Sequence, residues 1–453
     1  MLHTAVAYLQ TPRLAKALAT VSIAVSILAT PIHTLIGWPG LIAVITGLVV
    51  FAVASLIARR DELEWSGLVP FSLLVFLGWA GISVFWSQYQ WATVGGLAYL
   101  AAYTALGLYI ALMRDTIQIV RAFGDVLRFV LVASLALEVF SGLLIDLPIP
   151  FLGIQGNLAE GGPIQGLAGT RNQLGIIAML AAVTFGTELR TKSIQPPLAI
   201  ASLVLAGITM LFSRSPLIGG DIVILAAAIV ALYLIRRVSP ARRTIAQIAL
   251  LVIAAVVALL TWGFRARIVD LTNAGGELDF RLALWNQILD LIALNSLEGW
   301  GWLGYWHAEI SPFQAFTAIE RVPYSGLNAY LDVWFQLGLV GLVIFVGLVG
   351  LAFVRSWLLA GQKRSIVYAW PALVLLVLLT SGLFESSLLV EYGWLTFVVC
   401  CVKAAHELSW RRAFAAFTKQ TTKADRSVSG QFFIRPDPVG GDQPAVGNDD
   451  DKC

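Results

Sequence analysis

Two arginines beside apolar segments are the residues of this chain best suited to chemistry. Arg214 stands in the run Leu211-Phe-Ser-Arg-Ser-Pro216, where one apolar segment ends and the next begins, and Arg281 lies in an Arg- and Trp-rich stretch. A guanidinium group presents a planar fork of donors that binds phosphate oxygens in pairs. A charge at such a membrane depth is costly, so it is kept for pairing, snorkelling or function. We therefore expect these arginines to bind an anionic group, and snorkelling of Arg214 to the lipid headgroups is the alternative.

Arg281 lies near the start of a predicted amphipathic helix, whose amino-terminal dipole favours a bound anion. The alternative is an ion pair of Arg281 with Asp279 or Glu277. Two further carboxylates, Glu138 and Glu385, lie within or at the ends of apolar segments, so we expect them to have partners. The predicted partners are Arg171 and Arg214.

A run rich in Trp and Gly follows, Glu298-Gly-Trp-Gly-Trp-Leu-Gly-Tyr-Trp306-His307. Its glycines allow close backbone approach, and its flat rings could stack on sugars. Aromatic residues at a membrane surface more often form a belt. His307, Glu309 and Glu298 could each act as a general base, since histidine titrates near neutrality and a carboxylate accepts a proton. The alternative is that all three are loop residues that face solvent.

The composition places these residues in a membrane protein. Hydrophobic residues make up 58% of the chain and charged residues 13%, and the mean hydropathy is +0.82. A soluble domain carries about 25% charged residues. None of the three cysteines has the spacing of a metal site. We therefore expect membrane lipids as partners, no metal, no cofactor and no nucleic acid.

Runs of about 20 apolar residues predict about twelve membrane-spanning helices. The predicted spans are Ala17–Ile36, Leu41–Ala58, Leu68–Trp86, Thr93–Met113, Val126–Leu144, Leu174–Thr187, Pro197–Phe212, Leu217–Ile235, Ile245–Phe264, Asn328–Val354, Val367–Phe384 and Ser387–Val402. Most Arg and Lys residues fall in inner loops when both termini are cytoplasmic. The fold predicted from the sequence is therefore an all-α, multi-pass integral protein of the cytoplasmic (inner) membrane.

Two long segments are predicted to lie outside the membrane, at about 146–172 and 265–327. The predicted outward cations are all arginines: Arg171, Arg214, Arg265, Arg267, Arg281 and Arg321. In the second segment, Asp279 is expected to cap an interfacial helix with apolar residues at steps of three and four. These are Leu282, Trp285, Ile288, Leu289 and Ile292. The membrane domain is predicted over residues 1–418, and the polar tail 419–453 is predicted to be disordered and cytoplasmic.

Taken together, these segments resemble the O-antigen ligase and O-antigen polymerase superfamily of bacterial polysaccharide assembly. The resemblance rests on short elements that occur in order, on the predicted outer side. Each is similar to a family pattern, which is given in brackets. They are Gly81–Gln88 (S-x-x-W-S), Gly169–Asn172 (G-x-x-x-N, here one residue shorter), Leu211–Ser215 (S-R-[GS]), Phe280–Trp285 with Glu298–Gly301 (R-x-x-x-W … G-W-G), Asn328–Asp332 with Gln336–Gly338 (H-N-x-x-L … G) and Thr380–Glu385 (S-x-x-E, here one residue longer).

Members of this family transfer a glycan from a polyprenyl-diphosphate carrier, outside the membrane and without a metal. The acceptor is a lipid in ligases and another carrier-linked unit in polymerases. The resemblance implies that Arg214 and Arg281 bind the diphosphate and stabilise the charge that grows on the leaving group. Leu327 stands where the family usually has a histidine before Asn328. The role of that histidine is then vacant, is taken by His307, Glu298 or Glu309, or is not needed. A different class of acceptor and a loss of activity are two further alternatives.

The sequence thus predicts a membrane glycosyltransferase that acts as a polysaccharide polymerase or ligase in cell envelope or exopolysaccharide biogenesis. The expected catalytic residues are Arg214, Arg281, His307 and Glu298. The expected substrate-binding residues are Arg171, Asn172, Trp285, Trp300, Arg321 and Asn328. The expected partners are a carrier-linked glycan, a lipid or glycan acceptor, and export or chain-length proteins. The rivals are a non-catalytic family member and a transporter or flippase, although the sequence shows neither the half-repeats nor the broken helices of a transporter.

Overall fold

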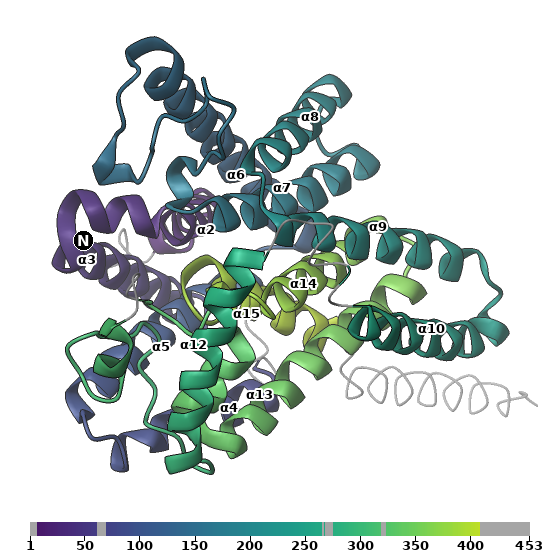
Figure 1. Ribbon diagram of the computed structural model, residues 1–453. Coiled ribbons are helices and arrows are strands. Elements are labelled where there is room, and N and C mark those ends of the chain that lie inside the picture. Colours follow the sequence, from purple (N-terminus) through teal and green to yellow (C-terminus); the bar gives the residue numbers. More distant parts are fainter. Residues whose placement is uncertain (1–6, 61–68, 265–266, 268–274, 319–322, 408–453) are drawn as a thin grey trace, which may run out of the picture. The chain divides into compact units, whose positions relative to one another are not determined.

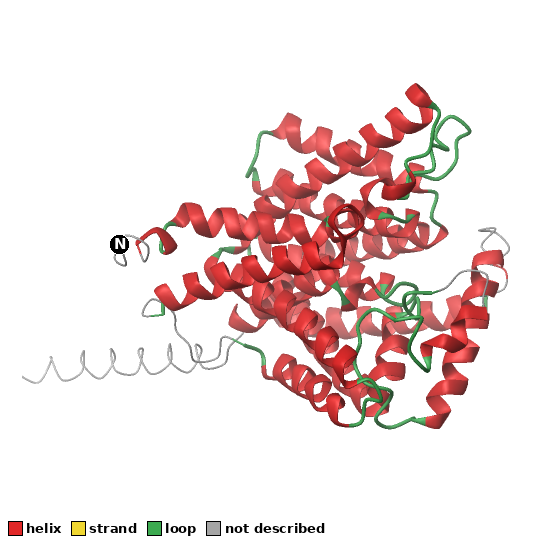
Figure 2. Ribbon diagram, turned by 90° about the vertical axis from the view of Figure 1, so that its left-hand side faces the viewer, coloured by secondary structure: helices red, strands yellow, loops and turns green. Residues whose placement is uncertain are grey.

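The computed structural model describes residues 7–60, 69–264, 267, 275–318 and 323–407. The regular elements in these ranges are helices, which confirms the predicted all-α class (Figures 1 and 2). All of these ranges belong to one unit, residues 1–407. Arg321 and the predicted tail 419–453 lie outside the described residues.

The helices lie mainly where the apolar runs predict them. In chain order they are α2 (Pro12–Ile27), α3 (Ala29–Ala58), α4 (Phe71–Ile82), α5 (Gln90–Met113), α6 (Thr116–Val139, continued by a π-helical turn to Ile145), α7 (Arg171–Thr191), α8 (Pro196–Ser213), α9 (Pro216–Arg237), α10 (Arg243–Gly263), α12 (Gly275–Leu294), α13 (Ala329–Gln362), α14 (Ala369–Ser381) and α15 (Glu391–Glu407).

Eight helices in the described part of the chain are long and apolar enough to cross a membrane, which supports a multi-pass membrane protein. They are α3, α5, α6, α7, α8, α9, α10 and α13. Every predicted span overlaps a helix, but four spans correspond to the shorter helices α2, α4, α14 and α15. The count of twelve spans therefore stays a prediction. The predicted boundaries of the first span are wrong, because the chain breaks at Leu28, between α2 and α3.

Two helices are broken at a glycine. Gly37 in α3 has a φ of 72° and Gly338 in α13 has a φ of 69°, a region that glycine reaches without steric cost. At Gly338 a Cβ atom would overlap the carbonyl oxygen of Leu297. The amide of Leu339 donates to the carbonyl of Ser296 at 2.9 Å. The break in α13 is thus where the preceding loop packs backbone against backbone.

Burial differs sharply between helices. Every side chain of α15 from Glu391 to Val402 is buried, whereas α10 has no buried residue and lies beside α9 (Figure 1). An apolar helix that is exposed all round is suited to lipid rather than water. An ion pair between the half-buried Arg128 and the buried Glu188, at 2.6 Å, joins α6 to α7.

The predicted amphipathic helix is present as α12, and it forms a small second core with the loop that follows it. Leu284, Ile288 and Ile292 are buried there with Trp306 and with Phe335 of α13. One detail of the prediction is wrong, because the helix begins at Gly275, so Asp279 lies inside it and is not its cap. Leu282 and Leu289 are exposed, and the contact of this helix with the membrane surface stays a prediction.

Candidate functional site

The centre of the candidate site is an ion pair between Arg281 on α12 and Glu385 in the turn after α14. Arg281 Nη2 lies 3.0 Å from Glu385 Oε1, and both side chains are less than a tenth exposed. Arg281 Nη1 donates to the carbonyl oxygen of Leu327, at 3.2 Å, and to that of Phe384. A buried charge is tolerated when it is paired and hydrogen-bonded, as it is here. The alternative considered for Arg281, an ion pair with Asp279 or Glu277, is therefore wrong, since its partner is Glu385.

A chain of hydrogen bonds extends from this pair to α7 and α9. Asn172 Nδ2 donates to Glu385 Oε1 at 2.8 Å, and Ser215 Oγ donates to Asn172 Oδ1 at 2.7 Å. Asn172 is held in the first turn of α7, which Thr170 caps by accepting from the amide of Gln173. The network therefore joins α12, the turn after α14, the start of α7 and the start of α9.

Arg171 stands next to Asn172 in the chain and forms an ion pair with Glu277 of α12. The Arg171 side chain is 28% exposed and that of Glu277 is 37% exposed. The start of α7 is therefore joined to α12 directly by this outer pair, and indirectly by the bond from Asn172 to Glu385, the partner of Arg281. An exposed pair of this kind is weak and can open at little cost.

Arg214 stands next to Ser215 and ends α8 in the left-handed conformation, with a φ of 45°. This conformation is uncommon for a residue with a Cβ atom and is often found at functional sites. The side chain is exposed and forms no ion pair within the described ranges, although it passes close to Gly161. A strained, exposed arginine at the junction of α8 and α9 is available to a ligand.

Glu138 and Glu385 do not have the partners predicted for them. Glu138 Oε1 accepts hydrogen bonds from the amides of Gln165 and Gly166, each at 2.8 Å. The carboxylate therefore anchors the loop before α7, and it does not pair with Arg171 or Arg214. That loop is the one that brings Gly161 close to Arg214.

Asn328 and Trp285 hold the start of α13 in place. Asn328 Oδ1 accepts from the amides of Tyr330 and Leu331 at 3.0 and 3.1 Å, which makes it the cap of α13. Trp285 Nε1 donates to the carbonyl oxygen of Gly326 at 2.9 Å. Leu327, at the position of the missing histidine, has a φ of 47° and offers its carbonyl oxygen to Arg281. In this arrangement Asn328 and Trp285 are structural neighbours of the ion pair.

The Gly-Trp-Gly run is held by buried hydrogen bonds from α13. Asp332 accepts from Trp306 Nε1 at 2.7 Å and from Gln336 Nε2 at 2.8 Å. Gln336 Oε1 in turn accepts from the amides of Leu303 and Gly304. Sequence reasoning gave Asp332 and Gln336 no role beyond a motif match. The signal that could have identified them is an acid and an amide four residues apart in an apolar helix.

The remaining predicted residues lie at the edge of this loop. His307 and Glu298 are exposed, and the His307 ring lies 6.3 Å from that of Trp91. The carbonyl oxygen of Glu298 accepts from Trp86 Nε1 at 3.0 Å. Trp300 is half-buried and donates to the carbonyl oxygen of Leu291. Within the described residues, no hydrogen bond or ion pair joins these side chains to Arg281 or Glu385.

Comparison with known families gives one match. Residues 199–346 match the family model described as O-Antigen ligase. The matched segment contains Arg214, Arg281 and Asn328, whereas Asn172 and Glu385 lie outside it. No curated protein matches the chain.

Proposed function

We propose that this chain belongs to the O-antigen ligase and polymerase superfamily, which its match over residues 199–346 supports. Its proposed reaction is the transfer of a glycan from a polyprenyl-diphosphate carrier to an acceptor at the outer face of the cytoplasmic membrane. The acceptor is a lipid in a ligase and a carrier-linked glycan in a polymerase. The observation that carries the proposal is the placement of Arg214 and Arg171 on the two sides of the bond between Ser215 and Asn172.

Arg214 and Arg171 are the proposed diphosphate ligands because both can reach solvent. Arg214 is exposed and Arg171 has only a partly exposed ion pair to release. The starts of α7 and α9 meet at the same place, and the unpaired amides of a helix start favour an anion. Two forked cations beside two helix starts suit a group with two negatively charged phosphates.

Arg281 takes a different role from the one expected from the sequence. Its guanidinium group is buried and already bound to Glu385 and to two carbonyl oxygens. We assign it the task of holding Asn172, through Glu385, and the start of α13 in place. It positions the site, while Arg214 and Arg171 contact the leaving group.

The proposed reaction breaks one bond and forms one bond. The acceptor hydroxyl oxygen attacks the anomeric carbon of the carrier-linked sugar, and the bond from that carbon to the diphosphate oxygen breaks. The electron pair leaves with the polyprenyl diphosphate, whose charge Arg214 and Arg171 stabilise. The acceptor proton passes to a base, for which His307 and Glu298 are the proposed residues because both are exposed on the loop.

The transporter alternative gains one observation, since α3 and α13 are broken helices of the kind found at transport sites. At the break in α13, however, the freed backbone groups, a carbonyl and an amide, are hydrogen-bonded to the loop. Gly301 N donates to the carbonyl oxygen of Gln336, and Leu339 N donates to that of Ser296. The break therefore docks a loop and does not leave backbone groups open for a substrate.

The proposal is tested by turnover of the purified full chain in lipid vesicles. Lipid-linked glycans extracted from a strain that lacks the protein serve as donor and acceptor. We expect release of polyprenyl diphosphate together with a longer or lipid-anchored glycan. Movement of the intact lipid-linked glycan between leaflets, with no polyprenyl diphosphate released, would instead identify a flippase.

A further inference from the structure

Two helix connections that lie far apart in the sequence meet at the end of α9. Arg236, in the last turn of α9, donates through Nη2 to the carbonyl oxygens of residues 363–365, at 2.6, 3.1 and 2.8 Å. A Cβ atom on Gly361 of α13 would lie 3.4 Å from the side chain of Ile235 in α9 and 3.6 Å from that of Gln247 in α10. The connection from α9 to α10 and the connection from α13 to α14 therefore converge at one place.

Five arginines gather at this convergence, and we call them the basic patch: Arg236, Arg237, Arg242, Arg243 and Arg364. Arg237, Arg242 and Arg364 are exposed, whereas Arg236 and Arg243 are half-buried. Arg243 lies close enough to Arg236 for their like charges to repel each other. Repulsion of this kind destabilises a folded chain unless an anion offsets it.

The helices that carry the basic patch supply no such anion. Residues 222–269 and 333–384 include most of α9 and α13 and all of α10 and α14, and they contain no Asp or Glu. Within the described ranges, no ion pair involves an arginine of the basic patch. The patch is therefore a place of uncompensated positive charge that attracts an anion from outside the chain.

An excess of Arg and Lys in cytoplasmic loops also serves to orient a membrane protein, and this accounts for the presence of cations in each connection. Orientation depends only on the side of the membrane at which the charges lie. Here the fold also gathers the arginines of two connections, because Arg236 bonds to backbone 127 positions away. Their clustering is therefore a feature that orientation alone does not require.

An exposed apolar row leads away from the basic patch along α10, which lies beside α9 (Figure 1). No residue of α10 is buried. Ile245, Ile248, Val252, Val256 and Leu259 follow one another at steps of three or four and are between 49% and 72% exposed. The row is about 21 Å long, at 1.5 Å per residue, and a single leaflet has about 15 Å of hydrocarbon. An acyl chain can therefore lie along the row through the depth of one leaflet.

We propose that the basic patch and the apolar row of α10 bind one anionic phospholipid, with its phosphate group at the arginines and an acyl chain along the row. Guanidinium groups bind phosphate oxygens in pairs, and basic pockets between membrane helices suit anionic headgroups. Phosphatidylglycerol fits this description, whereas the choline of phosphatidylcholine brings a further cation to the patch. The patch and Arg214 lie at opposite ends of α9, about 33 Å of helix apart, so this inference does not rest on the proposed function.

Native mass spectrometry on the purified full chain tests the preference for an anionic headgroup. The probes are phosphatidylglycerol and phosphatidylcholine with the same acyl chains. We expect phosphatidylglycerol to bind at least about tenfold more tightly, because it alone brings a net negative charge to the patch. Equal binding of the two lipids would contradict the inference.

One exposed arginine from each connection can be removed without disturbing a buried group. Arg242→Gln and Arg364→Gln should each weaken phosphatidylglycerol binding about fivefold, and the double variant about 25-fold, because both connections contribute to one site. Arg13→Gln with Lys16→Gln is the matched control, since it removes two exposed cations from α2, which packs against α3 and α6. An equal loss in the control, or no loss in one of the single variants, would show that the two connections do not form a site.

Two further probes distinguish a phospholipid from a bare phosphate. Dioctanoyl phosphatidylglycerol has the same headgroup and shorter chains, so it should bind at least about tenfold more weakly, and soluble glycerol 3-phosphate should not displace the long-chain lipid. Equal binding of the short-chain lipid, or displacement by equimolar glycerol 3-phosphate, would overturn the role of the apolar row. Arg214→Ala should lose turnover and still bind phosphatidylglycerol, which separates this inference from the proposed function.

Discussion

Ser215 donates its hydroxyl to the amide oxygen of Asn172 at 2.7 Å, and each partner has an arginine as its neighbour in the chain. The bond between α7 and the start of α9 therefore brings the backbone at Arg171 close to the backbone at Arg214, although 43 positions separate Ser215 and Asn172. The arginine that sequence reasoning expected at this place, Arg281, is instead buried against Glu385.

The pair of Arg281 and Glu385 should behave as one buried unit. Removing either partner leaves an uncompensated charge, so Arg281→Ala and Glu385→Ala should each lower the free energy of unfolding by about 3–5 kcal/mol. The double variant should lose less free energy of unfolding than the two single variants lose together, because neither charge is left unpaired. Denaturant unfolding of the four proteins in detergent checks this, and additive losses would contradict a direct pair.

The exposed pair of Arg171 and Glu277 should compete with the donor for Arg171. Glu277→Gln frees the guanidinium group, and exposed pairs are worth at most about 1 kcal/mol, so KM for the lipid-linked donor should fall by up to about fivefold. Asp290→Asn, an exposed acid of the same helix, is the control and should leave KM unchanged. An unchanged KM in Glu277→Gln would remove Arg171 from the diphosphate site.

Gly338 should be essential to the docking of the Gly-Trp-Gly loop on α13. Gly338→Ala forces a left-handed residue and overlaps the carbonyl oxygen of Leu297, so we expect a loss of about 2 kcal/mol or more in stability, with loss of turnover. Gly347→Ala lies in the same helix with open space around it and should be close to neutral. Similar thermal unfolding of the two variants would contradict the packing described.

The base on the loop should be identified by two separate substitutions. If His307 takes the acceptor proton, His307→Ala should lower kcat by about 10²–10⁴, and if Glu298 does so, Glu298→Gln should have that effect. Single-turnover rates measure this without the contribution of product release. Full activity in both variants would leave the reaction without either base and would favour a mechanism in which the proton leaves to water.

The sequence predicted the positions of the helices and the accessibility of Arg214 more successfully than it predicted which charged side chains form ion pairs. Apolar runs locate helices because each must fill the membrane, and Arg214 was identified by its place between two runs. For Arg281 the sequence suggested a bound anion or, as the alternative, a carboxylate of its own helix, but its partner Glu385 lies 104 positions away on another helix end. Such a contact depends on tertiary packing, which residue spacing within one helix does not encode.

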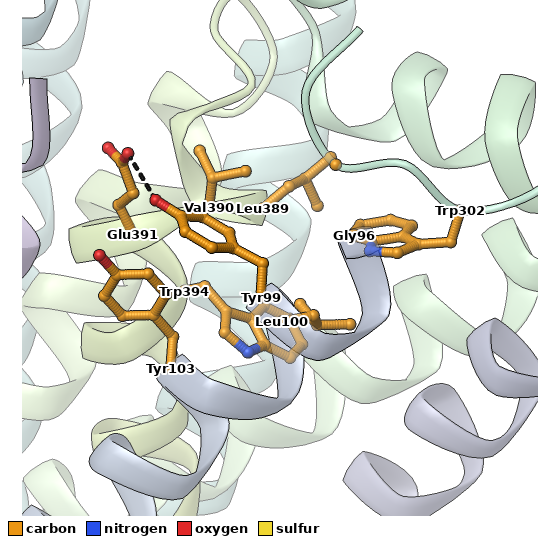
Figure 3. Close-up of a pocket in the computed structure, with 10 residues that line it drawn as sticks. Gly96, Tyr99, Leu100, Tyr103, Trp302, Leu389, Val390, Glu391 and Trp394 are labelled. Atoms are coloured by element: carbon orange, nitrogen blue, oxygen red, sulfur yellow. Dashed lines mark hydrogen bonds between the residues drawn. The ribbon is translucent and has the colours of Figure 1, made fainter. Parts of the chain in front are cut away.

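Glu391 was missed for a different reason. It lies inside the predicted span Ser387–Val402, where an acid is by default a functional residue, so a signal was present in the sequence. Its meaning depends on Tyr99, which is 292 positions away, and on a backbone conformation that only the fold reveals. An acidic residue in an apolar span marked Glu391 as important, but only the folded structure shows that it lies at a cavity (Figure 3).

The most direct test of the account is the rate of polyprenyl diphosphate release by Arg214→Ala in vesicles supplied with lipid-linked glycans. Loss of a group that stabilises the leaving charge should lower this rate about 10²–10³-fold, with unfolding unchanged because the side chain is exposed. Arg190→Ala, an exposed arginine in the last turn of α7, should retain the wild-type rate. A wild-type rate in Arg214→Ala would contradict the central claim that Arg214 binds the diphosphate.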